Sequence, residues 1–193
     1  KVSDIKIENT KKEIDQLILL NTSFLLEKNI FFVNKKKILK NLDKLNFIES
    51  ISIEKIYPST IYIKTKVTNF VAITYIDQKK RFVGLNGNFI LAKNILNEKK
   101  LPIIFGKFNP GDYIILQREL LRQKIDPNEI IKYYFHKNKR WDLHFKNNII
   151  IKLPSKNITK ALKLLKEFEL SNIIPPGTII DLRIQNRLIL SNE

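Results

Sequence analysis

Apolar residues in the N-terminal part of the chain recur at spacings that change from strand to helix and back. Residues 2–7 alternate between apolar and polar, which predicts a short strand. Residues 14–25 and 34–45 place apolar side chains three and four positions apart, which predicts two amphipathic helices, and Asn34 is a good N-cap for the second. Residues 51–63 return to a period of two around a proline-containing turn. The second helix is expected to bury Ile38, Leu42 and Leu45.

The pattern changes near residue 70 to short apolar runs separated by turns. Residues 71–76 and 81–83 flank a polar loop and predict a hairpin. Gly87 stands in a turn where a positive φ is expected. A helix of about three turns follows, and it is expected to bury Tyr113, Leu116, Leu120 and Leu121.

The C-terminal part of the chain predicts further strands around one more helix. Residues 141–145 and 149–153 are expected to form two strands joined by a tight turn. A helix begins near Asn157 and ends before two consecutive prolines, because proline cannot continue a helix. Residues 178–184 and 188–190 are the last expected strands. The expected class is α+β, with a β-α-α-β-β domain at residues 1–70 and a mainly antiparallel β domain with flanking helices at residues 71–193.

The amino-acid composition limits the kinds of protein to which this chain can belong. Hydrophobic residues at 44% and charged residues at 28% describe an ordinary folded chain. The absence of cysteine excludes disulfides, cysteine-bound zinc and thiol catalysis. The absence of methionine, and hence of an initiator, leads us to expect a piece of a longer protein. The net charge of +16 comes from residues scattered along the chain, which favours a solvated lysine-rich surface over a nucleic-acid-binding face.

Side chains that could act in catalysis or bind a metal do not form a recognisable catalytic pattern. His136 and His144 are the two histidines, and no cluster of carboxylates accompanies them. The five glycines form no phosphate-binding loop, and Asp142 and Asp181 are single acids in expected strands. We therefore predict no catalytic, cofactor or metal site. The aromatic run 133–135 beside a lysine-rich turn is either a stacking surface for single-stranded nucleic acid or, as we favour, one strand with alternate faces filled.

Trp141 is the single tryptophan of the chain, and two interpretations of it are open. We expect a core aromatic that anchors two strands, in preference to a platform for a ligand. Its neighbours Arg140 and Asp142 are expected to be surface partners on the opposite face of the strand.

The sequence also resembles a known family in several motifs. Those motifs are Arg140-Trp141-Asp142-Leu143-His144-Phe145, Ile149-Ile150-Ile151-Lys152-Leu153-Pro154 and Ile179-Ile180-Asp181-Leu182-Arg183-Ile184. Together they resemble the C-terminal domain of the bacterial cell-division FtsQ/DivIB family. The segment 101–106 is similar to the Leu-Pro-x-x-x-Gly segment of that family, and residues 56–63 resemble the last hairpin of a POTRA domain.

The resemblance implies a binding scaffold without catalysis. The parent protein would cross the bacterial inner membrane once, before Lys1, and this chain would lie in the periplasm. Its partners would be FtsB- and FtsL-like division proteins, with other components of the division machinery binding the POTRA domain. Neither a cofactor nor nucleic acid is expected.

The last strand is the candidate binding element. Because it ends the chain, it is expected at a sheet edge, whose unpaired N–H and C=O groups can pair with an incoming strand. An edge closed by the protein's own tail is the alternative. Carried over from the family, the partner-binding residues would be Arg183, Ile184, Asn186, Leu188 and Leu190.

Two rival functions make different predictions. A POTRA-containing outer-membrane assembly or secretion factor would need repeated POTRA units or a barrel of alternating strands. A basic nucleic-acid-binding module would bind with a steep salt dependence and would need the lysines near residues 133–139.

Overall fold

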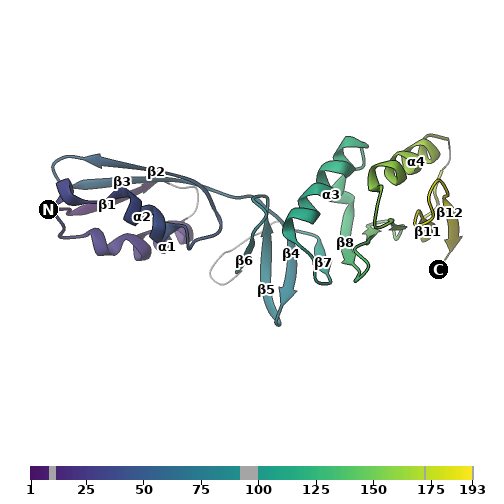
Figure 1. The fold of residues 1–193 in the computed structure, drawn as a ribbon, viewed down its shortest axis with the longest axis horizontal. Helices are drawn as coiled ribbons and strands as arrows, with labels where there is room; N and C mark the ends of the chain where they lie inside the picture. The colour runs from purple at the N-terminus through teal and green to yellow at the C-terminus, as the bar shows by residue number, and fades with distance from the viewer. Residues whose placement is uncertain (9–11, 92–99, 172, 193) are drawn as a thin grey trace. The chain divides into compact units, whose positions relative to one another are not determined.

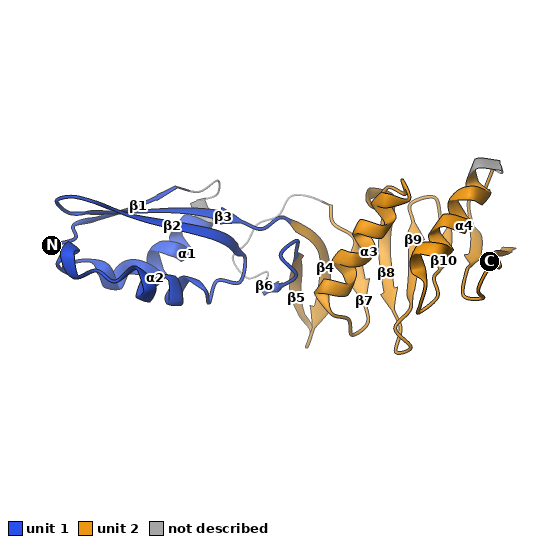
Figure 2. Ribbon diagram, turned by 45° about the horizontal axis from the view of Figure 1, so that its top comes forward, with its two compact units in different colours: residues 1–69, 84–98 blue, residues 70–83, 99–193 orange. Residues whose placement is uncertain are grey.

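The computed structural model describes residues 1–8, 12–91, 100–171 and 173–192. The chain forms two units, which Figures 1 and 2 show. Unit 1 contains residues 1–69 and 84–98, and unit 2 contains residues 70–83 and 99–193. The segment 84–98 therefore groups with the N-terminal residues.

Unit 1 has the strand, helix, helix, strand, strand order that the sequence predicts. Its sheet has the order β1-β3-β2, with β1 parallel and β2 antiparallel to the central β3. The elements are β1 (Asp4–Glu8), α1 (Lys12–Thr22), η1 (Ser23–Leu25), η2 (Ile30–Phe32), α2 (Lys35–Leu42), β2 (Ile48–Ile56), β3 (Thr60–Val67) and, after the excursion into unit 2, β6 (Phe89–Leu91). The core between sheet and helices includes the buried residues Ile14, Ile18, Ile38, Leu42, Ile61 and Ile63.

The expected cap of the second helix is confirmed, but that helix is shorter than predicted. The Asn34 side chain accepts a hydrogen bond of 2.9 Å from the Lys36 amide, so it satisfies a free N–H at the first turn. The helix ends at Leu42, and Leu45 lies in the turn that leads to β2, with its amide donating to the Leu42 carbonyl at 2.8 Å. Leu45 is half-buried there.

Unit 2 is a sheet with two helices over one of its faces (Figure 2). Within this unit the strand order is β12-β11-β10-β9-β8-β7-β4-β5. Pairing is antiparallel for β8–β9, β9–β10 and β11–β12, and parallel for β4–β7, β7–β8 and β10–β11. The elements are β4 (Phe70–Ile76), β5 (Lys79–Gly84), β7 (Ile103–Phe105), α3 (Pro110–Arg122), η3 (Pro127–Glu129), β8 (Ile130–Phe135), β9 (Trp141–Phe145), β10 (Ile150–Lys152), α4 (Ile158–Ser171), β11 (Thr178–Asp181) and β12 (Ile189–Asn192).

One line of buried side chains crosses the sheet of unit 2. We call it the core row: its members are partners in register on neighbouring strands and are at most 2% exposed, namely Thr74, Ile104, Tyr133, Leu143, Ile151 and Ile180. Helix α3 covers the middle of the row, because the Tyr113 ring meets the Tyr133 ring edge-on at 5.1 Å and Gln117 Nε2 donates to the Tyr133 hydroxyl at 2.7 Å. Burial raises the pKa of both tyrosine hydroxyls.

Trp141 is a core residue, as the sequence predicts. It is 2% exposed, and its ring lies 4.7 Å from that of Phe135 and 5.8 Å from that of Phe108. Tyr133 is buried while the adjacent Tyr134 is half-buried and stacks on Phe105 at 4.9 Å, so the aromatic run is one strand with both faces occupied.

Four expectations about single residues or strand boundaries are wrong. Asp142 is 7% exposed and not a surface residue, and its Oδ2 atom lies 2.8 Å from His136 Nε2. Leu121 is 60% exposed, since α3 buries the neighbouring stripe that contains Leu120. The strand expected at 178–184 ends at Asp181, and the strand expected at 188–190 begins at Ile189.

Gly87 has a φ of +77°, which confirms its expected positive value. In the described part of the chain, no helix is both long and apolar enough to cross a lipid bilayer.

Candidate partner-binding edge

Strand β12 forms one edge of the sheet in unit 2. It pairs antiparallel with β11, with Ile180 opposite Leu190 and Asp181 opposite Ile189, and it ends the strand order. Across the ranges that the structure describes, no strand pairs with its outer side. All four of its residues are exposed. The backbone of β12 therefore presents unpaired donors and acceptors to solvent.

The core row reaches solvent at this edge through Leu190. Directly opposite residues of paired strands lie on the same face, so Leu190 continues the row beyond Ile180. Ile180 is fully buried, whereas Leu190 is 47% exposed. An added strand would extend the row by one residue and cover Leu190.

A tight turn separates β11 from β12. Leu182 extends the end of β11, because its amide donates to the Lys152 carbonyl at 2.9 Å and its side chain is buried. The Arg187 amide then donates to the Ile184 carbonyl at 3.1 Å. Asn186 has a φ of +58°, a left-handed conformation that asparagine tolerates better than most residues. This turn leaves the Ile184 side chain 51% exposed.

An ion pair holds the start of this turn. The Asp181 carboxylate accepts from the Arg183 amide at 2.9 Å and from Arg183 Nε at 2.8 Å, and Arg183 Nη2 also donates to it. The side-chain hydrogen bonds from Arg183 lower the pKa of Asp181, and they raise the pKa of Arg183. The arrangement fixes the direction in which the chain leaves β11.

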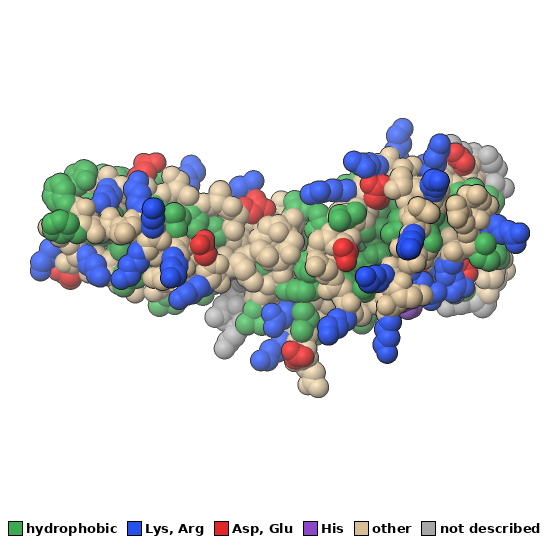
Figure 3. All heavy atoms as spheres, in the orientation of Figure 1, with side chains coloured by type: hydrophobic (Ala, Val, Ile, Leu, Met, Phe, Trp, Pro, Cys, Tyr) green, Lys and Arg blue, Asp and Glu red, His purple; other side chains and the backbone are tan. Residues whose placement is uncertain are grey.

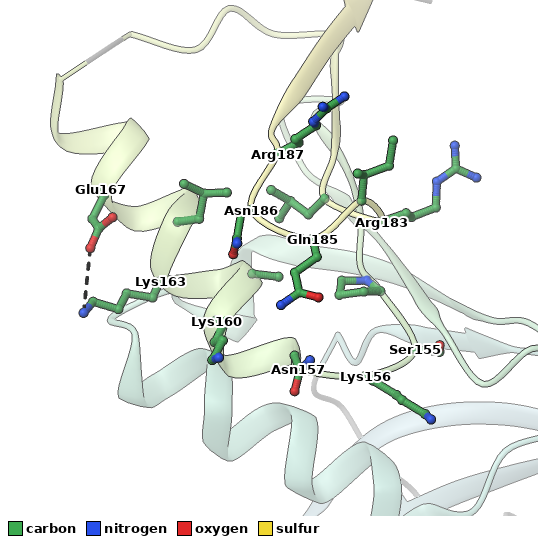
Figure 4. A pocket seen from close by; sticks show the side chains of 15 residues that line it. Ser155, Lys156, Asn157, Lys160, Lys163, Glu167, Arg183, Gln185, Asn186 and Arg187 are labelled. Carbon is green, nitrogen blue, oxygen red and sulfur yellow. Dashed lines mark ion pairs between the residues drawn. The ribbon is translucent and has the colours of Figure 1, made fainter.

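A groove of about 540 Å³ lies between the turn and the N-terminal half of α4 (Figure 4). Gln185 and Asn186 point into it from the turn. Its lining includes five cationic side chains, those of Lys156, Lys160, Lys163, Arg183 and Arg187. The acid among the lining residues is Glu167, whose carboxylate lies 3.9 Å from Lys163 Nζ. Arg183 already pairs with Asp181 and Lys163 lies near Glu167, so the remaining positive charge of the lining comes from Lys156, Lys160 and Arg187 and favours an acidic group.

The predicted site residues fall into two sets. Arg183, Ile184 and Asn186 come together on the turn, where all three line the groove. Leu188 is half-buried just before β12, and Leu190 lies in β12 itself. Their role in binding a partner stays a prediction.

Sequence reasoning missed two further components of the edge. Ile189 is 45% exposed and lies between the two leucines that the family resemblance suggested, so the apolar triplet 188–190 was a usable signal. The lysines of α4 are the second component, and their position beside the turn depends on how α4 packs, which no local pattern reveals. In the described residues, no group of three or more His, Cys, Asp or Glu side chains is placed to hold a metal ion.

Comparison with known proteins identifies both parts of the chain. The protein-family model described as "POTRA domain, FtsQ-type" matches residues 1–66. The model described as "Cell division protein FtsQ/DivIB, C-terminal" matches residues 72–183, more than half of the chain. This second match ends at Arg183, so β12 lies beyond it.

Individual relatives agree with the family models. The chain is 25% identical over 193 residues to the cell division protein FtsQ of Agrobacterium fabrum, covering 96% of this chain and 59% of that protein. It is 29% identical over 163 residues to the protein of the same name from Rickettsia conorii, covering 82% of this chain and 60% of that protein. For Rickettsia bellii the identity is 28% over 175 residues, with 89% of this chain and 64% of that protein covered. The chain thus spans about three fifths of the length of these relatives.

Proposed function

The chain belongs to the FtsQ/DivIB family of cell-division proteins, and from this premise we propose that its C-terminal edge captures a strand of a partner protein. The partner is an FtsB-like division protein, which brings an FtsL-like protein with it. In this role the chain is a scaffold that recruits other proteins to the division site and carries out no reaction of its own.

The observation that carries this proposal is the core row ending in the exposed Leu190. A strand that pairs with β12 gains backbone hydrogen bonds, which give affinity without depending on sequence. An apolar partner residue opposite Leu190 would extend the buried row and give specificity. Burial of one such side chain contributes about 1.5–3 kcal/mol.

The basic groove beside the turn supports the same role. Because its lining carries five cations and one acid, an acidic side chain of the partner would find favourable charge there. The groove begins where the turn leaves β11, so one partner segment could pair with β12 and place a neighbouring residue at the groove. We expect the groove to set orientation and association rate more than affinity.

The family also suggests where the protein lies in the cell and what its two domains do. We propose that the parent protein is anchored in the bacterial inner membrane and that this chain lies in the periplasm. A domain at residues 71–193 would hold the edge, and the POTRA-like domain at residues 1–70 would bind other components of the division machinery.

Titration calorimetry with the periplasmic segment of the FtsB-like partner tests the proposal. The substitution Leu190→Asp places a charge at the end of the core row, so we expect binding at least about tenfold weaker. Leu121→Asp is the matched control, because Leu121 is 60% exposed on α3 and lies outside the edge. Equal loss in both variants, or none in either, would contradict the proposal.

Partner peptides with N-methylated amides test strand pairing itself. Only alternate amides of a strand point toward one neighbour, so methylation of one alternate set should abolish binding and methylation of the other set should leave it. If both peptides bind as well as the unmodified one, the partner contacts side chains and does not extend the sheet.

A further inference from the structure

Large apolar side chains protrude together at one end of unit 1. Figure 3 shows hydrophobic side chains gathered at this end, where Figure 1 marks the N-terminus. We call this set the aromatic tip: it comprises Leu26 (43% exposed), Phe31 (69%), Phe32 (84%), Ile56 (48%) and Tyr57 (56%). These fractions are high for residues that avoid water, so the tip is an unusual surface for a folded domain.

Hydrogen bonds and a ring contact hold three segments together at the tip. Lys55 Nζ donates to the Phe31 carbonyl at 3.2 Å, and the rings of Phe31 and Tyr57 lie 5.1 Å apart, which joins η2 to the β2–β3 turn. The Val2 amide donates to the Lys28 carbonyl at 2.7 Å, which joins the first residues to the segment before η2. Protrusion of the aromatic rings is therefore a feature of the folded unit.

The Asn29 side chain fixes the start of η2. It accepts from the Phe31 amide at 3.0 Å, and Phe31 and Phe32 follow as the exposed part of this short helix. Ile30, the residue before them, is 1% exposed and anchors η2 in the core. One buried residue thus holds two exposed phenylalanines in place.

Lysines outnumber acids in the segments that carry the tip. Residues 1–3, 26–37 and 55–59 make up its three segments and contain six lysines, at positions 1, 28, 35, 36, 37 and 55. Glu27 is the acid in these segments, and its carboxylate lies 3.5 Å from Lys1 Nζ. Lys28 Nζ and Lys37 Nζ each lie 5.7 Å from the Phe24 ring centroid, so one lysine from each side of η2 reaches the same ring.

We propose that the aromatic tip inserts into the surface of a lipid bilayer that contains anionic lipid. Phenylalanine and tyrosine rings favour the membrane interface, and flanking lysines gain from the negative surface potential of anionic headgroups. A bilayer supplies counter-charge to all the lysines at once and needs no complementary shape. These protruding rings, in segments where lysines outnumber acids, therefore fit a lipid surface better than a protein partner.

This inference does not depend on the partner-binding edge. The tip lies in unit 1 and the edge lies in unit 2, so a variant of one leaves the other intact. Loss of lipid binding and loss of partner binding are separate results.

Co-sedimentation of the chain with vesicles tests the inference. Vesicles of equal phosphatidylglycerol and phosphatidylethanolamine should bind it, and vesicles of phosphatidylcholine alone should bind it far less. The double variant Phe31→Ser/Phe32→Ser should lose roughly tenfold or more in affinity for the anionic vesicles. Tyr75→Ser/Leu121→Ser is the matched control with unchanged binding, because both residues are over half exposed and lie in unit 2.

A fluorescence measurement distinguishes insertion from charge attraction alone. In a Phe32→Trp variant, lipids brominated near the headgroup should quench the new tryptophan on binding. Trp141 is 2% exposed in unit 2, so the unsubstituted chain should show little quenching and serves as the internal control. Absence of vesicle binding, binding unaffected by loss of both phenylalanines, or no quenching of the new tryptophan would each overturn the inference. Binding of the tip to a protein with no affinity for vesicles would overturn it as well.

Discussion

At the scale of single residues, the ion pair between Asp181 and Arg183 controls the path of the chain into the candidate edge. Arg183 contributes hydrogen bonds from both its backbone and its side chain to one carboxylate. The turn that follows carries Ile184 and Asn186, two of the predicted partner-binding residues. A change at Asp181 therefore acts on the geometry of the edge without altering its outer surface.

The substitution Asp181→Asn should reduce stability in a pH-dependent way. Because Arg183 lowers the pKa of Asp181 in the folded state, the stabilisation is present above the carboxyl's unfolded pKa of about 4 and is lost as the pH falls through the lower folded value. We expect a loss of about 1 kcal/mol at neutral pH, since Arg183 is largely solvent-accessible. Thermal unfolding of both proteins at several pH values measures it. A difference that stayed constant down to pH values well below 4 would show that the carboxylate charge is not the cause.

Trp141 is the residue whose loss should cost most in unit 2. Its ring contacts those of Phe108, Tyr113, Tyr133 and Phe135, and Trp141→Ala would leave a large cavity among them. We expect a loss of about 3–5 kcal/mol in the free energy of unfolding, measured by urea denaturation. Tyr75→Ala, at a 57% exposed aromatic, is the control and should change stability by less than about 1 kcal/mol. Similar losses in both variants would contradict the assignment of Trp141 to the core.

At the scale of elements, the β4–β5 hairpin holds two residues in an unfavourable backbone conformation. Asp77 and Gln78 have φ values of +50° and +59°, as a two-residue hairpin turn of the I′ type requires. A glutamine is less stable than a glycine in this left-handed backbone region, because its Cβ atom crowds the backbone. Gln78→Gly should therefore raise the free energy of unfolding by about 1 kcal/mol, which chemical denaturation can measure. Arg118→Gly, at an exposed position inside α3, should instead lower it by about 1 kcal/mol; a loss in both variants would mean that the turn is not strained.

Local sequence patterns account well for the elements and poorly for the edge of the sheet. Hairpins and amphipathic helices depend on residues close in sequence, so period and turn residues predicted the hairpins and the cap at Asn34. Alternation of Leu182 and Ile184 indicated a longer strand, but the chain bends after Asp181 because Arg183 closes back onto that carboxylate. The edge position of the last strand was predicted because that strand ends the chain, and it is confirmed, but its pairing with β11 follows from tertiary contacts that no local pattern encodes.

Two residues show why single side chains were harder to place than elements. Asp142 is buried in β9, where its carboxylate contacts His136, six positions earlier at the start of the β8–β9 connection. Leu121 fits a helical stripe as well as Leu120 does, and only the packing of α3 on the sheet decides which of the two is buried. In both cases the deciding partner comes from the folded arrangement.

At the scale of the whole molecule, a net charge of +16 raises the question of which contacts are specific. Cationic proteins bind any polyanion at low salt, because phosphate contacts release counterions. Strand pairing and apolar burial at Leu190 depend much less on salt. The proposed partner and a nucleic acid should therefore respond differently to ionic strength.

Titrations at two salt concentrations that differ by a factor of four should separate these contacts. Affinity for a single-stranded oligonucleotide should fall by roughly a hundredfold or more, while affinity for the partner segment should fall by less than about tenfold. Fluorescence anisotropy with labelled ligands measures both. Oligonucleotide binding that survives the higher salt would favour a nucleic-acid-binding role for the lysine-rich surface.

Hydrogen exchange of the β12 backbone with and without the FtsB-like partner tests the proposed strand capture most directly. The amides of residues 189–192 that point away from β11 are exposed in the free chain, and pairing with a new strand should slow their exchange strongly. Amides of α3 serve as the internal reference and should not change. Saturating partner binding that leaves exchange across 189–192 unchanged would contradict capture of the partner by this edge.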